Sequence, residues 1–251
     1  MTLTWNSINK KLVTGLSSLS FGPPVLHVYN PLEYGINAYN QYLERFGSGT
    51  KRVIFLGMNP GPWGMVQTGI PFGEVAAVKE WLGIAQGVNP PARMHVRRPV
   101  EGFLCNRSEV SGRRLWGWAK ERFTTPEEFF HDFFVANYCP LAFMEESGKN
   151  RTPDKLPRVE RERLFSQCDQ ALRETVALLK PAWVIGVGKF AMEQATRALH
   201  GERIAIGSIA HPSPANPQAN KGWAPLVDRQ LAKLGILDGE TRQTEEVLRF
   251  F

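Results

Sequence analysis

Four short apolar runs constrain the fold of this chain more than any other feature of its sequence. Each run is four to six residues long and is followed within two residues by Gly, Asn or His. Continuous apolar runs of this length are typical of strands that are buried on both faces of a parallel sheet. The runs cover residues 53–56, 133–136, 183–187 and 204–209.

Segments of helical periodicity lie between these runs. Asn30-Pro31 is a favourable helix start, and apolar residues recur from there at helical spacing up to Gly47. The clearest helix is predicted for residues 160–180, where Pro181 ends an apolar stripe. Strands that alternate with helices predict a three-layer α/β/α fold around a central, mostly parallel four-stranded sheet. Ligands in such folds bind beyond the carboxyl ends of the strands, so functional residues are expected directly after each run.

The length of 251 residues fits one large domain. We expect a single domain over residues 1–251, with residues 1–30 as an N-terminal extension and residues 238–251 as a charged C-terminal tail. Lys and Arg number 30 against 24 Asp and Glu, which gives a net charge of +6. This excess favours a polyanionic partner, although charge alone does not identify it.

The sequence offers no pattern for a metal site or a membrane span. Cys105, Cys139 and Cys168 are widely spaced, and no histidine is placed to complete a zinc or iron–sulfur set. We therefore expect buried, reduced thiols, no metal and no cofactor. No apolar run approaches the ~18 residues that a membrane-spanning helix needs, and no export signal is apparent. We expect an intracellular protein, in the cytoplasm or nucleoid if bacterial and in the nucleus if eukaryotic.

Three loops that follow predicted strands carry the residues suited to chemistry. The loop at residues 57–75 is rich in Gly and Pro, so its backbone can approach a flat ligand closely, and Phe72 offers a stacking surface. A second loop begins with the carboxamide of Asn137, and a third, stiffened by prolines, begins with His211. A lone histidine or asparagine after a strand is usually structural. The coincidence of the three loops favours a functional role instead.

Together these loops resemble the single-strand-selective monofunctional uracil-DNA glycosylases of the uracil-DNA glycosylase superfamily. The resemblance rests on GMNPGPWGMVQTGIPFGEV at residues 57–75, NYCPL at residues 137–141 and HPSPANPQANKGW at residues 211–223. It implies a metal-independent DNA glycosylase that flips out uracil, or an oxidised uracil such as hydroxymethyluracil, and hydrolyses its N-glycosidic bond. The abasic site would pass to base-excision repair. The partner would be uracil-containing DNA, single- or double-stranded, and we expect a monomer.

The resemblance also implies roles for individual residues. Asn59 corresponds to the asparagine that orients the attacking water, since an amide cannot take up a proton at neutral pH. His211 corresponds to the donor to uracil O2, where negative charge collects as the base leaves. Asn137 corresponds to the residue that reads the uracil edge. The other base-binding residues would be Phe72, stacked on the base, with Gly61 and Met65 near its C5 edge and Met58 beside them.

Two further sets of residues are expected to contact DNA. Related proteins often carry Arg at the position of Ala215, so penetration of the helix is expected to rest on Pro214, Asn216 and Gln218. The whole wedge that fills the space of the flipped nucleotide would comprise Pro212, Ser213, Pro214, Ala215, Asn216, Pro217 and Gln218. The residues expected at DNA phosphates are Gly188, Lys189 and Lys221.

The segment at residues 186–191 also imitates a dinucleotide-binding fingerprint. The imitation is partial, because Ala191 stands in place of the third glycine and no acidic residue closes a second strand at the required distance. A tight strand-to-helix turn and a helix N-terminus that holds a DNA phosphate are the two remaining interpretations.

Two other functions remain open from the sequence: a glycosylase that acts mainly on deaminated purines, and a non-catalytic module that binds damaged bases. The pyrimidine-sized stacking loop disfavours the first, and the pairing of Asn59 with His211 disfavours the second. No lysine in the catalytic loop could form a Schiff base, so strand cleavage is not expected. Glu74 begins a predicted helix, where its carboxylate favours the helix dipole, and we expect it to be structural. The sequence does not rank uracil, hydroxymethyluracil, hypoxanthine and xanthine as substrates, or single strands against duplexes.

Overall fold

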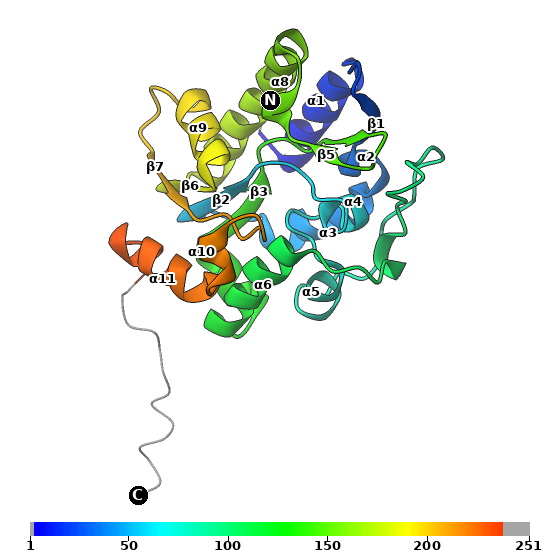
Figure 1. Cartoon of the computed structure of the whole chain (residues 1–251). Coiled ribbons are helices and arrows are strands. Elements are labelled where there is room, and N and C mark those ends of the chain that lie inside the picture. Colours follow the sequence, from blue (N-terminus) through cyan, green and yellow to red (C-terminus); the bar gives the residue numbers. More distant parts are fainter. Residues whose placement is uncertain (1–2, 238–251) are drawn as a thin grey trace, which may run out of the picture.

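A parallel sheet of four strands forms the centre of the molecule in a computed structural model, which describes residues 3–237 (Figure 1). Its strands are all parallel and follow the order β3-β2-β6-β7. The predicted central sheet is confirmed, since all four strands coincide with the apolar runs. The strands are β2 (Val53–Gly57), β3 (Phe133–Asn137), β6 (Trp183–Val187) and β7 (Ala205–Ile209).

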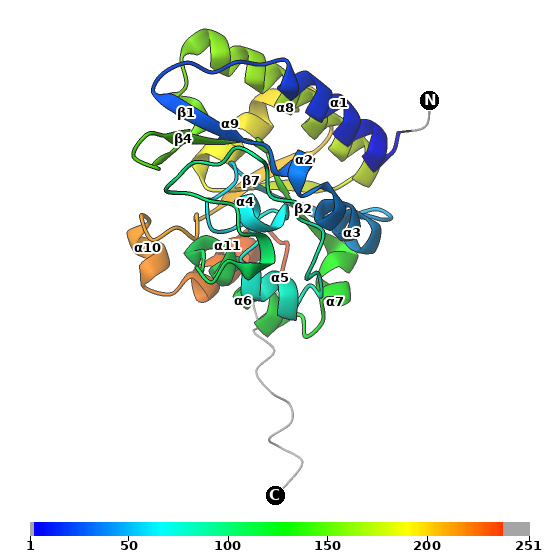
Figure 2. The same ribbon diagram turned by 90° about the vertical axis from the view of Figure 1, so that its right-hand side faces the viewer.

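Helices cover both faces of this sheet, as predicted (Figures 1 and 2). One face carries α8 (Arg158–Leu179) and α9 (Lys189–Ala198), and α1 (Trp5–Ser17) packs on α8. The other face carries α6 (Val110–Arg122), α7 (Pro126–Asp132) and α11 (Trp223–Lys233). None of the helices in the described part of the chain is long and apolar enough to cross a membrane.

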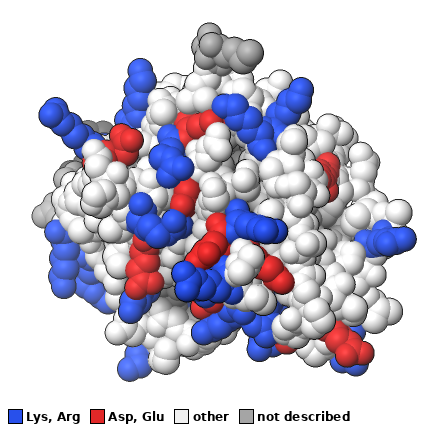
Figure 3. Space-filling model, turned by 90° about the horizontal axis from the view of Figure 1, so that it is seen from above, with Lys and Arg blue, Asp and Glu red and all other residues white. Residues whose placement is uncertain are grey.

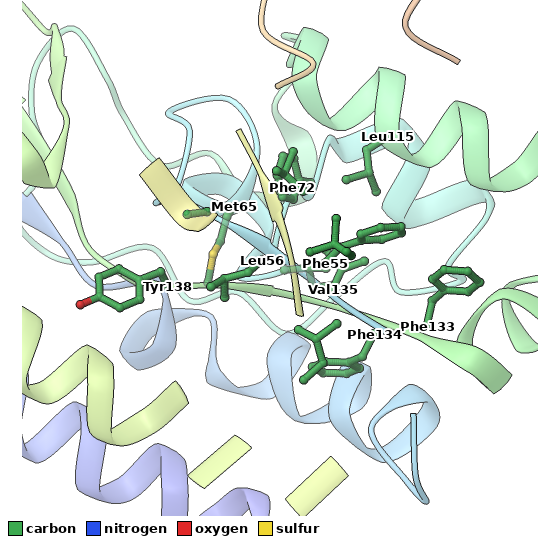
Figure 4. Packing of buried hydrophobic residues seen from close by; sticks show 14 of the residues in the cluster. Phe55, Leu56, Met65, Phe72, Leu115, Phe133, Phe134, Val135 and Tyr138 are labelled. Carbon is green, nitrogen blue, oxygen red and sulfur yellow. The ribbon is translucent and has the colours of Figure 1, made fainter. Parts of the chain in front are cut away.

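Aromatic side chains fill the space between the sheet and one helical layer (Figure 4). Phe55 on β2 stacks on Phe133 of β3, with ring centroids 5.3 Å apart, and on Phe129 of α7 at 6.4 Å. All five residues of β2 are buried, because helices cover the strand from both sides. This two-sided burial is the reason that the run is apolar at every position.

The sequence did not predict a second, antiparallel sheet of three strands. It consists of β1 (Val25–Tyr29), β4 (Ala142–Glu145) and β5 (Asn150–Arg151), in the order β1-β4-β5. The strands are short and their buried positions do not alternate, so periodicity could not reveal them. Both α1 and β1 lie within the segment predicted as an N-terminal extension. The predicted tail at residues 238–251 lies outside the described residues.

The helix predicted after Asn30 is divided at Gly35 into α2 (Pro31–Tyr34) and α3 (Ile36–Phe46). A Cβ added to Gly35 would lie 3.1 Å from the Cα of Gly69, so two glycines allow the backbones to approach here. The other short helices are α4 (Met65–Thr68), α5 (Val75–Glu80) and α10 (Pro217–Asn220), with 3-10 turns at Gly102–Leu104 and Pro153–Lys155.

Candidate active site

A cavity of about 520 Å³ opens beyond the carboxyl ends of the parallel strands. Its walls come from the loop after β2, the start of α6, the end of β3, the region of β5 and the loop after β7. The three loops singled out in the sequence therefore meet at one place. The lining residues are Met58, Asn59, Pro60, Gly61, Pro62, Phe72, Glu109, Ser111, Asn137, Asn150, Thr152, His211, Ser213, Ala215 and Asn216.

Asn59 is held in one orientation within this cavity. Its side-chain NH₂ donates to the carbonyl of Leu141 at 3.2 Å. Asn150 donates to the carbonyl of Pro60 at 2.8 Å and so fixes the loop next to it. With the NH₂ of Asn59 engaged, its Oδ1 is the atom left to accept a hydrogen bond from a ligand or a water molecule.

His211 is oriented by its own loop and supported by Gly188. The backbone N–H of Ser213 donates to Nδ1 of His211 at 3.0 Å, so the neutral ring carries its proton on Nε2. Burial lowers the pKa of His211, which keeps the ring neutral at pH 7. Gly188 has a φ of +93°, and a Cβ there would lie 3.2 Å from the Cβ of His211. The site thus presents a neutral imidazole with an Nε2–H donor.

Asn137 ends β3 and is packed between Gly57 and Met65. A Cβ on Gly57 would overlap both Oδ1 of Asn137 and the ring of Phe72, so only glycine fits there. The Nδ2 of Asn137 donates to Sδ of Met65 at 3.2 Å. Met65 is buried and lies against Asn137, and it is not among the residues that line the cavity. The placement of Met65 near the C5 edge of the base stays a prediction.

Phe72 has a strained backbone that α6 holds in place. Its φ is +53°, a left-handed conformation that a bulky residue rarely adopts outside functional sites. The indole Nε1 of Trp116 donates to the carbonyl of Phe72 at 3.0 Å. A Cβ on Gly112 would overlap the same carbonyl, so α6 approaches the loop as closely as its backbone allows. The ring of Phe72 lines the cavity, with its centroid 6.4 Å from that of His211.

The predicted wedge divides into buried and exposed parts. Pro212 is buried, and its carbonyl accepts a hydrogen bond from Arg114 at 2.9 Å. Its part in the wedge stays a prediction. Asn216 donates to the carbonyl of His211 and accepts from the N–H of Gln218, so its amide serves the loop itself. The exposed members are Pro214, Ala215, Pro217 and Gln218.

The residues predicted at DNA phosphates have different surroundings. The N–H of Gly188 donates to the carbonyl of Ile209 at 2.8 Å, so this N–H is not free for a phosphate. Lys189 is exposed and pairs with Glu193 at 3.5 Å, and Lys221 is exposed. On the face seen in Figure 3, Lys and Arg side chains lie among Asp and Glu side chains. On this face the positively charged side chains do not form one continuous basic patch.

The imitation of a dinucleotide fingerprint has a structural explanation. A Cβ on Gly186 would overlap the backbone nitrogen of Met192 in α9, and Gly188 allows the approach of His211. The tight-turn interpretation of this segment is therefore supported.

Sequence reasoning missed Glu109, which lines the cavity at the start of α6. Burial and the charge of Glu74 raise the pKa of Glu109 to about 7. Nothing in the polar, arginine-rich sequence around Glu109 indicates that it lines a cavity, because only the fold brings its side chain to the loop after β2. Glu74 itself caps α5 by accepting from the N–H of Ala77 at 2.9 Å, as its position in the sequence predicted.

The three cysteines are buried and free, as predicted. Within residues 3–237, no group of three or more His, Cys, Asp or Glu side chains is arranged to hold a metal ion. The chemistry available in the cavity is that of carboxamides, hydroxyl groups, a neutral imidazole, a carboxyl group and an aromatic ring.

The model of the uracil DNA glycosylase superfamily matches residues 44–233, which contain the whole parallel sheet and every residue that lines the cavity. The chain belongs to this superfamily.

Comparison with individual relatives shows to which group within the superfamily the chain belongs. It is 46% identical over 241 residues to the single-strand selective monofunctional uracil-DNA glycosylase of Rattus norvegicus, with 93% of this chain and 87% of the relative covered. It is 46% identical over 224 residues to the corresponding protein of Bos taurus, with 88% and 82% covered. It belongs to this single-strand selective monofunctional group.

A solved structure with the same fold is that of SMUG2 from Pedobacter heparinus. The two share a TM-score of 0.63 with 16% identity, and the match covers 93% of this chain and 99% of the other. This likeness independently supports the α/β/α architecture.

Proposed function

We propose that this protein hydrolyses the N-glycosidic bond between uracil and deoxyribose in DNA and leaves an abasic site for base-excision repair. The observation that carries the proposal is the convergence of Asn59, Phe72, Asn137 and His211 on one cavity. These residues come from three loops, yet each presents the group that excision of a flipped pyrimidine requires. Acting on DNA, the enzyme works inside the cell.

The cavity suggests how the flipped base is held and recognised. The ring of Phe72 forms a stacking surface, and Asn137 reads the edge of the base that carries N3–H and O4. Its contact with Met65 fixes the NH₂ end of the amide. The fixed amide directs its oxygen to N3–H and its NH₂ to O4 of uracil. Cytosine has an acceptor at N3 and an amino donor at C4, so the same amide does not match it. Gly61 lines the cavity, and we place it near C5 of the base, where the oxidised methyl group of hydroxymethyluracil would lie.

Bond cleavage proceeds with the bonding electron pair moving to the base. The Nε2–H of His211 donates to uracil O2, where negative charge develops, and this donor is worth most in the transition state. The sugar becomes oxocarbenium-like, so weak activation of water is sufficient. Oδ1 of Asn59 orients that water toward C1′. As the new C–O bond forms, the water molecule loses a proton to the solvent. No lysine lines the described cavity, so no Schiff base forms and the strand is not cut.

Incubation of the protein with uracil-containing oligonucleotides, followed by alkali, tests this function. Strand breaks only after alkali, equally with and without a chelator, are expected from a metal-independent monofunctional enzyme. The variant Asn59→Ala is the matched control and should lose nearly all excision. Parallel substrates with hypoxanthine or xanthine test the purine alternative, and excision of these in preference to uracil would contradict the proposal. Binding of uracil DNA without any excision would identify a non-catalytic module.

A further inference from the structure

Glu109, which the proposed mechanism does not use, extends its carboxyl group into the wall of the base cavity. It precedes α6 at the cap position, but its side chain makes no capping hydrogen bond to the helix. The side chain turns instead to the loop after β2. A Cβ on Gly61 or on Gly64 would overlap Oε2 of Glu109. The two glycines are therefore what allows a carboxyl group to lie between the loop and α6.

In the described part of the chain, this carboxyl group has backbone N–H neighbours but no cation to compensate its charge. Its Oε2 is buried without a hydrogen bond in the described chain. Across residues 3–237, no Lys, Arg or His lies within ion-pair distance of it. Burial is the main cause that raises the pKa of Glu109, the charge of Glu74 adds to it, and the N–H groups of Gly64 and Trp63 oppose the rise. A buried polar atom left unpaired beside a reaction site calls for a functional explanation.

We propose that Glu109 is a residue of the base pocket that works as a neutral carboxylic acid, and that its ionisation suppresses excision at alkaline pH. The proposal rests on the proposed function, in which negative charge develops on uracil inside this cavity. An ionised carboxylate in the same wall repels that charge, and no nearby cation offsets the repulsion. The neutral acid removes the repulsion and adds an O–H donor.

The other charged groups around Glu109 do not account for an alkaline loss of activity. Burial lowers the pKa of His211, so its titration falls on the acid side of neutrality. Glu74 belongs to the cap of α5. Arg114 of α6 donates to the carbonyl of Pro212 in the loop after β7 and to Asn220 of α10, and Arg107 stacks over the ring of Trp63 at 4.3 Å. Arg113 is exposed, and the facing residues from the region of β5, Asn150 and Thr152, are uncharged.

The pH profile of kcat/KM for a uracil oligonucleotide, at constant ionic strength between pH 6 and 9, tests this proposal. This parameter reports the ionisation of the free enzyme. The wild-type value is expected to fall above about pH 7, approaching a tenfold loss for each further pH unit. The variant Glu109→Gln keeps the size of the side chain and cannot ionise, so its profile is expected to be flat over the same range.

Glu74→Gln is the second variant, since glutamine can still cap α5 but removes the like charge. It is expected to keep the wild-type rate at pH 6 and to move the alkaline loss to lower pH. If Glu109→Gln should be inactive at every pH, this shift alone decides the question. The proposal is overturned if the wild-type profile is flat, if Glu109→Gln retains the alkaline loss, or if Glu74→Gln leaves it unmoved.

Thermal melting supplies a readout that does not depend on excision. The unfolded chain loses the Glu109 proton near pH 4.5, whereas the folded protein keeps it to about pH 7. Between these values the folded state binds more protons, so wild-type stability falls as pH rises. The Tm of Glu109→Gln relative to wild type should therefore rise between pH 5 and 7 and then level off. An unchanging difference contradicts the proposal, whereas a wild type that excises no uracil at pH 6.5 contradicts the proposed function instead.

Discussion

His211 illustrates how one backbone hydrogen bond determines the chemistry of a side chain. Because Ser213 donates to Nδ1, the ring can donate only through Nε2 while it remains neutral. Replacement of His211 by Ala should lower the single-turnover excision rate by about 10²- to 10³-fold, because a donor aimed at developing charge acts mainly in the transition state. Affinity for the abasic product should change far less. Equal losses in rate and affinity would mean that His211 has a structural role.

Asn137 is predicted to decide between uracil and cytosine. Asn137→Asp removes the donor to O4 and supplies an acceptor suited to the cytosine amino group, so uracil excision should collapse while weak cytosine excision appears. Each unpaired buried group costs about 1–3 kcal/mol. Met65→Leu is the companion variant, since it keeps the volume but removes the sulfur that Asn137 contacts. It should weaken discrimination without abolishing excision. Near-parental cutting of uracil by Asn137→Asp would show that this residue does not read the base.

Among the helices, α6 holds two of the loops that form the base cavity in position. It carries Trp116, which bonds to the carbonyl of Phe72, and Arg114, which bonds to the loop that contains His211. Gly112 permits the close approach of this helix, whereas Gly117 on the same helix has open space around it. The two glycines therefore make a matched pair of sites for substitution.

Gly112→Ala and Gly117→Ala should have opposite effects. The added methyl group at Gly112 would displace the Phe72 backbone, lowering both thermal stability and excision. At Gly117 the change should stabilise the protein by about 0.5–1 kcal/mol, since alanine is the better helix former, and leave excision unchanged. Denaturant unfolding and single-turnover assays measure both. Full activity of Gly112→Ala would show that the position of α6 is not important for the cavity.

For the whole molecule, binding to undamaged DNA should weaken steeply with salt, because neutralising phosphates releases counterions. Lys189 and Lys221 are exposed cations in the segments that follow β6 and β7. Replacing either with Ala should reduce the slope of log K against log salt by about one. Arg203→Ala, at the exposed amino end of β7, is the control and should leave the slope unchanged. A binding constant that does not respond to salt would remove the case for phosphate contacts.

The sequence by itself determined the parallel sheet, because short runs made up almost entirely of apolar residues are stable when both faces of the sheet are covered. It also determined which loops would meet, because parallel strands end at one edge. The resemblance to a known family then named Asn59, Asn137 and His211 within those loops. Only the tertiary structure decided that Met65 lies against Asn137 and that Glu109 enters the cavity wall. Those outcomes depend on contacts between segments distant in the chain. Local periodicity and turn chemistry carry no information about such contacts.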